Sequence, residues 1–318
     1  MKYYEDIGDK KNKNSVKVKI DELNLETTKN LGKIKFDLNI EEFFNFDKEK
    51  LQEKTLIETL VFCGFKFGYY ILNTETKAQF EKEVCEYSQT LVGMVSKNII
   101  DNKGNTVFTL NGLDSNNYKK DEKLFEQYMY YIISRRENFI GISFIGHYEH
   151  IRNSFPSISE NDLDSLINNN KFIPEDRKEI FKRGIIYGFK GQWLEFLSLM
   201  CPQIENFYRE IIVFCGGTDN TYKQNYTQQE YFTLGSVLDN ETLNEYYKEN
   251  IILILKAILN EKAGSNLRNR VAHGLINDDE ANSGISIWLL FFVIMLCCWN
   301  NSYAVEILEK LNKKEQEE

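Results

Sequence analysis

The stretch from Asn266 to Leu275 holds the side chains of this chain that are best suited to chemistry. Arg268 precedes His273 with four residues between them, and His273 is one of only three histidines among the 318 residues. A guanidinium offers a charged fork to an oxyanion or phosphate, and an imidazole carries protons near neutral pH. The pair therefore suits phosphate chemistry in which a proton is transferred.

A helix through this stretch would place Asn269 and His273, which are four residues apart, on one face, with Arg268 and Arg270 on its two sides. The opposite face would be an apolar stripe made of Leu267, Val271 and Leu275. We therefore expect His273 to point away from the core. An Arg and a His at this spacing also arise by chance. The alternative is that Asn266 and Asn269 cap the helix while the arginines are solvated.

The run from Arg268 to Gly274 reads Arg-Asn-Arg-Val-Ala-His-Gly. It resembles the Arg-x(4–6)-His motif of the HEPN superfamily, most of all its bacterial branch with Arg-Asn-x-x-x-His-Gly. Residues 184–193 are similar to the Gly-rich amphipathic helix that precedes the motif in that branch, and residues 201–209 to its Pro-Gln-Ile-Glu-x-x-x-Arg segment. The resemblance covers about residues 175–300.

This resemblance implies an all-helical HEPN bundle whose protomers pair so that two motifs face one cleft. It also implies metal-independent RNA cleavage, often in antiphage or toxin systems. Other members of the superfamily only bind nucleotides or dimerise. A catalytically silent module that binds a nucleotide or a protein partner is therefore the alternative function. A helical adaptor, in which the motif helix only makes a dimer contact, is a third.

RNA cleavage by its own 2′-OH needs a base, an acid and positive charge for the phosphorane. We expect His273 to transfer protons, with a second His273 supplied by a homodimer, and Arg268 to stabilise the phosphorane. Asn269 could orient the imidazole or the phosphate. Glu205 and Arg209 form an i, i+4 pair that is either a surface pair or a support in which Glu205 holds Arg268 or His273. Arg270 completes the supporting set.

Two further groups of polar residues have a functional and a structural interpretation. Five basic side chains could track an RNA backbone or form a solvated helix face: Arg177, Lys178, Lys182, Arg183 and Lys190. His147, Glu149 and His150 could ligate a metal, but no third ligand lies at a typical spacing. A polar helix end is the alternative for that group. We therefore predict neither a bound metal nor a cofactor.

The elements that must position these residues are mainly helical. Alternating apolar residues predict two short strands near 16–20 and 34–40. Gly, Asn and Asp predict a loop, and a domain boundary, over 101–117. Pro202 predicts a break, and Gly216-Gly217 a helix end. Helices are predicted over 48–72, 75–100, 121–134, from Pro174 to Pro202 and on to Gly216, near 234–238, over 241–260, from about 267 and over 285–311.

We accordingly predict a mainly α protein, with a C-terminal HEPN-like helical bundle and a mostly helical N-terminal region that includes a short β element. The predicted domains are an N-terminal region of unknown role over 1–117, a connecting helical segment over 118–173 and the HEPN-like domain over 174–318.

Composition excludes some classes of protein. A net charge of −9 argues against a general nucleic-acid coating protein, although a local basic cleft could still bind RNA. The six cysteines form no CxxC pair and indicate reduced core residues of a cytoplasmic protein. The N-terminus has no apolar signal region. The apolar run 285–299 is shorter than the ~18 residues of a membrane span, so we expect a buried helix and no membrane.

The sequence thus predicts a homodimeric, metal-independent HEPN-type endoribonuclease that acts on RNA in antiphage defence or as a toxin. An antitoxin or another component of a defence system is a candidate partner.

Overall fold

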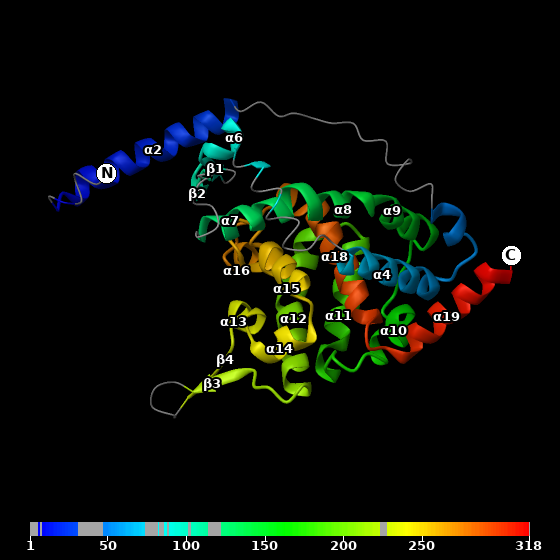
Figure 1. Ribbon diagram of the computed structural model, residues 1–318. Helices are drawn as coiled ribbons and strands as arrows, with labels where there is room; N and C mark the ends of the chain where they lie inside the picture. Colours follow the sequence, from blue (N-terminus) through cyan, green and yellow to red (C-terminus); the bar gives the residue numbers. More distant parts are fainter. Residues whose placement is uncertain are drawn as a thin grey trace. The chain divides into compact units, whose positions relative to one another are not determined.

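The computed structural model describes residues 6, 8–30, 47–73, 82, 86–87, 89–100, 103–113, 122–222 and 228–317. These residues are mainly helical, with two antiparallel two-stranded sheets (Figure 1). The predicted mainly α fold with a short β element is confirmed. The predicted strand near 34–40 lies outside the described residues.

The chain divides into two compact units, each discontinuous in sequence. Unit 1 comprises Met1–Leu38 and Glu81–Gln127, and unit 2 comprises Asn39–Phe80 and Tyr128–Glu318. Residues 39–80 and 128–173 therefore share one unit with the C-terminal helices, which differs from the division predicted at 117 and 173. The physical reason is that the helix over 56–72 packs on the apolar run over 284–298.

Unit 1 contains helix α2 (Lys10–Asn30), the short α6 (Leu91–Met94) and the hairpin of β1 (Lys97–Ile100) and β2 (Thr106–Leu110). The strand predicted near 16–20 is wrong, because this segment lies inside α2. The helix predicted over 75–100 is wrong at its end, where β1 forms. The loop predicted over 101–117 is wrong at β2, which pairs with β1 and buries Leu110.

The core of unit 2 is formed by α4 (Leu56–Leu72), α11 (Lys178–Phe189), α12 (Trp193–Phe214) and α18 (Gly284–Cys298), which pack side by side (Figure 1). Helix α18 is buried around its whole circumference. A glycine allows the close approach of α4, because a Cβ at Gly64 would lie 2.8 Å from Cys298 Sγ. In the same core, Trp288 Nε1 donates to Glu137 Oε2 at 2.5 Å.

The C-terminal run forms two helices where one was predicted over 285–311. Helix α18 ends at Cys298, and α19 (Ser302–Glu317) leaves at an angle of 100°. Asn300 adopts a positive φ of 54° at the corner, and Asn301 Oδ1 accepts from Ala304 N at 3.2 Å, which caps α19. Among the described residues, no single helix is long and apolar enough to cross a membrane, and only this bent pair reaches that length and composition together.

Two other helix boundaries differ from prediction. Helix α12 continues through Pro202, which lies on its exposed side, where the carbonyl left without a donor can meet water. It ends before Gly216, as predicted, and Gly217 N donates back to Ile212 O at 2.8 Å. The helix predicted over 241–260 is interrupted at Tyr247, which is extended and packs its ring against Tyr208.

The remaining elements complete the described fold. The predicted helix starts after Pro174, near 234–238 and near 267 are confirmed. The other elements are α7 (Glu122–Tyr131), η2 (Ile132–Glu137), α8 (Asn138–Ser143), α9 (Ile145–Ser154), η3 (Asn161–Leu163), α10 (Asp164–Asn168), η4 (Glu175–Arg177), β3 (Asn220–Tyr222), β4 (Gln229–Tyr231), α13 (Leu234–Leu238), α14 (Glu241–Tyr246), α15 (Glu249–Leu255), η5 (Lys256–Asn260), α16 (Leu267–Ala272) and α17 (Asp278–Ala281).

The described cysteines are all free thiols. Four are buried, namely Cys63, Cys201, Cys297 and Cys298, and Cys215 is half-buried.

Candidate functional site

The candidate motif lies on α16 and the turn that follows it. The helix begins after Asn266, whose φ is +49°, and ends at Ala272; His273 caps it, and Gly274 follows at φ +63°. Such a left-handed residue just past a helix end is typical of glycine. The predicted apolar stripe is only partly formed: Leu267 is buried, Val271 is half-buried and Leu275 is 62% exposed. Leu275 misses the core because α16 stops before reaching it.

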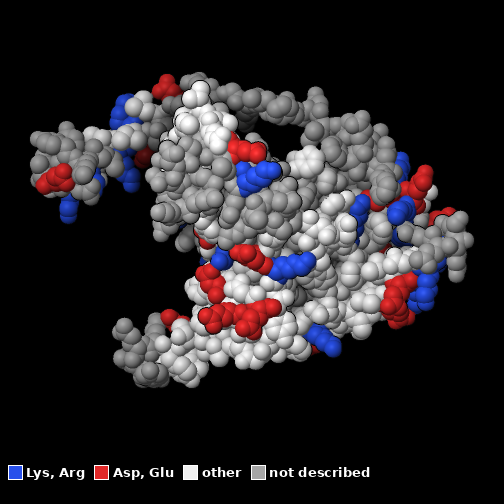
Figure 2. All heavy atoms as spheres, in the orientation of Figure 1, with Lys and Arg blue, Asp and Glu red and all other residues white. Residues whose placement is uncertain are grey.

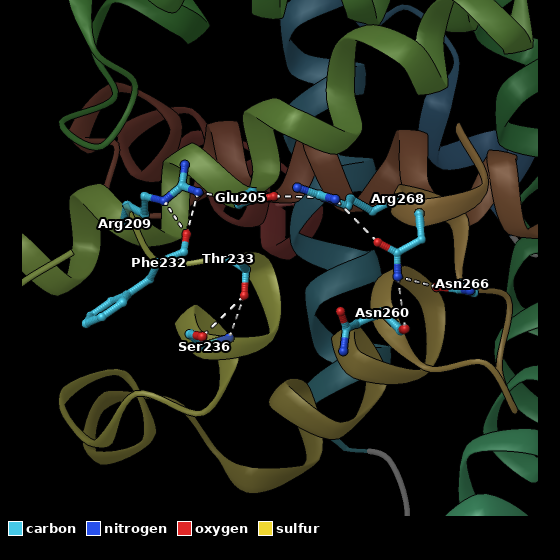
Figure 3. A network of polar contacts seen from close by, with 9 residues as sticks. Glu205, Arg209, Phe232, Thr233, Ser236, Asn260, Asn266 and Arg268 are labelled. Carbon is cyan, nitrogen blue, oxygen red and sulfur yellow. Dashed lines mark hydrogen bonds and ion pairs between the residues drawn. The ribbon is translucent and has the colours of Figure 1, made fainter. Parts of the chain in front are cut away.

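Glu205 joins α12 to the motif helix. Its Oε2 accepts from Arg268 Nε at 3.1 Å, across 63 residues of sequence (Figure 3). The Glu205 side chain is 7% exposed and that of Arg268 is 33% exposed. One of the two interpretations of the Glu205 and Arg209 pair was that Glu205 holds Arg268. The ion pair that this interpretation requires is present. The arginine is held at one edge and remains accessible to solvent.

Arg209 fixes the other side of the same carboxylate. Its Nη2 donates to Glu205 Oε1, and its Nε and Nη2 donate to the carbonyl of Phe232 at 3.1 and 2.6 Å (Figure 3). Its guanidinium also lies 5.7 Å from the centre of the Tyr231 ring. One buried carboxylate is therefore shared by two arginines, so the trio keeps a net positive charge. The carbonyl of Phe232 was not predicted, because a backbone acceptor leaves no sequence signal.

Asn269 links Arg268 to the segment before the motif. Its Oδ1 accepts from Arg268 Nη1 at 3.3 Å, and its Nδ2 donates to Asn266 Oδ1 at 2.7 Å and to Asn260 O at 3.4 Å (Figure 3). These partners occupy the amide, so the expected orientation of the His273 imidazole by Asn269 is not formed. Asn269 instead orients the guanidinium of Arg268.

His273 lies at the C-terminal end of α16 and is exposed. Within the described ranges its imidazole makes no hydrogen bond or ion pair, and only its backbone N–H is used, donating to Asn269 O at 3.0 Å. The prediction that this side chain points away from the core is confirmed. The imidazole is therefore available to a bound molecule or to a second protomer.

Arg270 projects to another neighbour. Its Nη2 lies 3.0 Å from Glu280 Oε1 on α17. Arg268 contacts α12, whereas Arg270 contacts α17. The ion pair of Arg270 therefore ties α16 to α17, across the turn that begins at His273.

The predicted basic face is largely neutralised. Lys182 is buried and paired with Asp164 and Glu179, so its assignment to an RNA track is wrong. Burial would lower the pKa of Lys182, but the hydrogen bonds to those two carboxylates raise it overall. Lys178 Nζ lies 2.5 Å from Glu175 Oε2, and Arg177 Nε lies 3.3 Å from Asp176 Oδ2. Of the five predicted cations, only Arg183 and Lys190 are exposed.

The described residues on the face shown in Figure 2 do not form a basic stripe either. On the face shown in Figure 2, acidic side chains gather over the region of α14 and α15, where Glu241, Glu245 and Glu249 are exposed. Such a surface repels a phosphate backbone. Among the described residues of unit 2, the motif region combines an accessible guanidinium with an accessible imidazole.

His147 is a core residue, and His150 is half-buried. His147 is buried, and its Nε2 lies 2.9 Å from Asp47 Oδ2, which also pairs with Lys66. Glu149 pairs with Arg152 at 3.3 Å instead. No group of three His, Cys, Asp or Glu side chains that could hold a metal ion occurs within the described ranges. The contact with Asp47 spans 100 residues and was not predicted.

Protonation of His147 is expected to destabilise the fold in acid. Burial, with the positive charges of Lys66 and His150, lowers the pKa of His147 from 6.5 to about 3. The folded chain thus favours the neutral imidazole, so this contribution to stability is complete above pH 6.5 and is lost as the pH falls toward 3. The expected slope is roughly 1.4 kcal/mol per pH unit. Denaturation of wild type and His147→Gln across this range measures it, and equal slopes would contradict it.

No protein-family model, no curated protein and no solved structure significantly matches this chain.

Proposed function

We propose that this chain is a HEPN-type endoribonuclease that cleaves RNA by attack of the 2′-OH on the adjacent phosphate, in antiphage defence or as a toxin. The observation that carries the proposal is the ion pair between Glu205 and Arg268. It joins the two segments on which the resemblance rests, the Pro-Gln-Ile-Glu-x-x-x-Arg segment and the Arg-Asn-x-x-x-His-Gly motif. It supports a single site built from both.

The charge of the phosphorane is assigned to Arg268. Nε and Nη1 of this guanidinium are held by Glu205 and Asn269, while Nη2 makes no hydrogen bond within the described residues. A phosphate oxygen could therefore bind the free edge without breaking either contact. A guanidinium fixed in advance stabilises charge that develops in a transition state without a cost of reorganisation.

Proton transfer is assigned to His273. A neutral imidazole takes the proton of the 2′-OH as this oxygen bonds to phosphorus, and an imidazolium gives a proton to the departing 5′-oxygen. One chain supplies one such histidine in this region. Two protomers with their His273 side chains in one cleft would supply the base and the acid together.

A twofold homodimer is therefore expected in solution. The exposed position of His273 and Leu275 leaves this end of α16 open to a second copy. Light scattering at micromolar protein should give twice the mass of the chain. A stable monomer with full cleavage activity would contradict the shared cleft.

The products of cleavage test the chemistry. Wild type should leave a 2′,3′-cyclic phosphate and a 5′-hydroxyl, because the nucleophile is the substrate's own 2′-OH. RNA with a 2′-O-methyl at the cut site, and DNA, should be inert, and activity should survive EDTA. Expression of wild type beside His273→Ala, with sequencing of cellular RNA 5′ ends, locates the cuts. Cleavage that leaves 5′-phosphate ends, or that stops with EDTA, would sink this mechanism.

A second candidate is a catalytically silent HEPN module that binds a nucleotide or a protein partner. It is favoured by the ion pair with Glu205, which lowers the positive charge that Arg268 can offer to a phosphorane. Such a module would bind a ligand through Arg268 without turning over RNA. This second function would be supported if the wild-type protein binds RNA or a nucleotide but produces no RNA 5′ ends that depend on His273.

A further inference from the structure

A hollow of about 750 Å³ lies between α9, the turn that joins α11 to α12, and α17, and no residue of the motif lines it. This volume lies in the range of pockets that hold small molecules. Its apolar lining is made by Tyr148 and Trp193, whose ring centres are 5.3 Å apart, with Ile145 and Ile287. Apolar and aromatic lining of this kind suits the aliphatic part of a ligand.

Apart from one ion pair, the charged side chains around this hollow have no partner among the described residues. Arg152 pairs with Glu149 at 3.3 Å and stacks on the Tyr148 ring at 5.2 Å. The other charged residues of the lining are exposed and form no hydrogen bond or ion pair through their side chains with any residue that the structure describes. They are one ammonium and three carboxylates: Lys190, Glu195, Asp278 and Asp279.

We propose that this hollow binds a basic amino acid, a small molecule in which a carboxylate and two cationic groups are joined by an aliphatic chain. The ligand carboxylate would meet Lys190, and its cationic groups would meet Glu195, Asp278 and Asp279. The chain would lie over the apolar lining, where the Trp193 ring also attracts a cation. A purely anionic ligand would be repelled by the three carboxylates. A purely cationic ligand would be repelled by the ammonium of Lys190.

The hollow is connected to the motif helix through α17. Glu280 Oε1 pairs with Arg270 at 3.0 Å, and Glu280 Oε2 accepts from Asn277 N at 3.3 Å. The one-turn helix that presents Asp278 and Asp279 to the hollow thus also contacts α16. A ligand that holds α17 in place should therefore slow hydrogen exchange in α16 as well as in α17.

Calorimetric titration of the full chain with matched probes tests the ligand class. L-lysine and L-arginine should bind at millimolar concentration or below. Cadaverine lacks the carboxylate of lysine, and L-norleucine lacks its side-chain ammonium. Each lost ion pair should weaken binding by roughly fivefold. Absence of binding by both basic amino acids, or cadaverine that binds as tightly as lysine, would overturn the proposal.

Variants of the lining test the place. Lys190→Gln should weaken lysine binding by roughly fivefold without weakening cadaverine binding, because only lysine carries the carboxylate. The double variant Asp278→Asn/Asp279→Asn should weaken both probes. Lys171→Gln, an exposed lysine elsewhere, is the matched control, and circular dichroism checks each fold. Unchanged lysine affinity in both lining variants, or lysine-induced protection from exchange that omits α9, α16 and α17, would overturn the assignment.

Discussion

Arg268→Ala and His273→Ala should each slow RNA cleavage by roughly 10²–10⁴-fold, because charge stabilisation and proton transfer each contribute on that order. The two variants should differ in their effect on folding. His273 is exposed and its imidazole makes no hydrogen bond or ion pair with a described residue, so its removal should change stability by no more than ~0.5 kcal/mol. Arg268→Ala also removes a partner of Glu205, so a measurable loss of stability is expected.

Single-turnover cleavage rates, measured beside denaturation curves, separate these effects. Arg268→Lys keeps the charge but loses the planar fork, so it should recover only part of the rate. Lys171→Ala is the control and should cleave like wild type, because this exposed lysine belongs neither to the motif nor to the five basic side chains considered for RNA. Cleavage by His273→Ala at the wild-type rate would remove this histidine from the mechanism. A large loss of stability in that variant would assign the residue a structural role.

Helix positions that depend on local chemistry could be predicted from the sequence. Pro174 starts the segment that leads into α11, Gly216 ends α12, and the apolar run over 285–299 is the buried core helix α18. Errors arose where tertiary packing overrides local preference. Pro202 sits on the exposed side of α12 and is tolerated there, and the corner at Asn300 divides the last helix.

Contacts in the candidate site could be predicted from the sequence only from helix geometry or from the family resemblance. A contact of Glu205 with Arg268 or His273 was one of two interpretations of the Glu205 and Arg209 pair, and the structure has the one with Arg268. Asn269 was paired with His273 on helical spacing, but α16 ends at Ala272, and left-handed Asn266 brings another amide to Asn269. Lys182 was wrongly placed on an exposed basic face. Helical periodicity does not show which face of a helix another segment covers, and here the segment that carries Asp164 covers Lys182.

Replacement of Glu205 by Gln should destabilise the fold by about 3 kcal/mol, the lower end of the range for breaking a buried ion pair, because Arg268 is one-third exposed. The amide keeps the shape of the carboxylate but not its charge. Arg209 and Arg268 would then face each other around a neutral group. An amide accepts through only one oxygen, so one of the two guanidinium contacts is lost as well.

Urea denaturation of Glu205→Gln beside Glu195→Gln, an exposed glutamate on the same helix, measures this cost. The control should lie within ~0.5 kcal/mol of wild type. In the double variant Glu205→Gln/Arg209→Gln the cost should be smaller than the sum of the single costs, because one uncompensated cation has been removed together with its partner. If the costs simply add, the carboxylate does not hold the two arginines together. Glu205 would then be a packing residue of α12, and the position of Arg268 would depend on Asn269 alone.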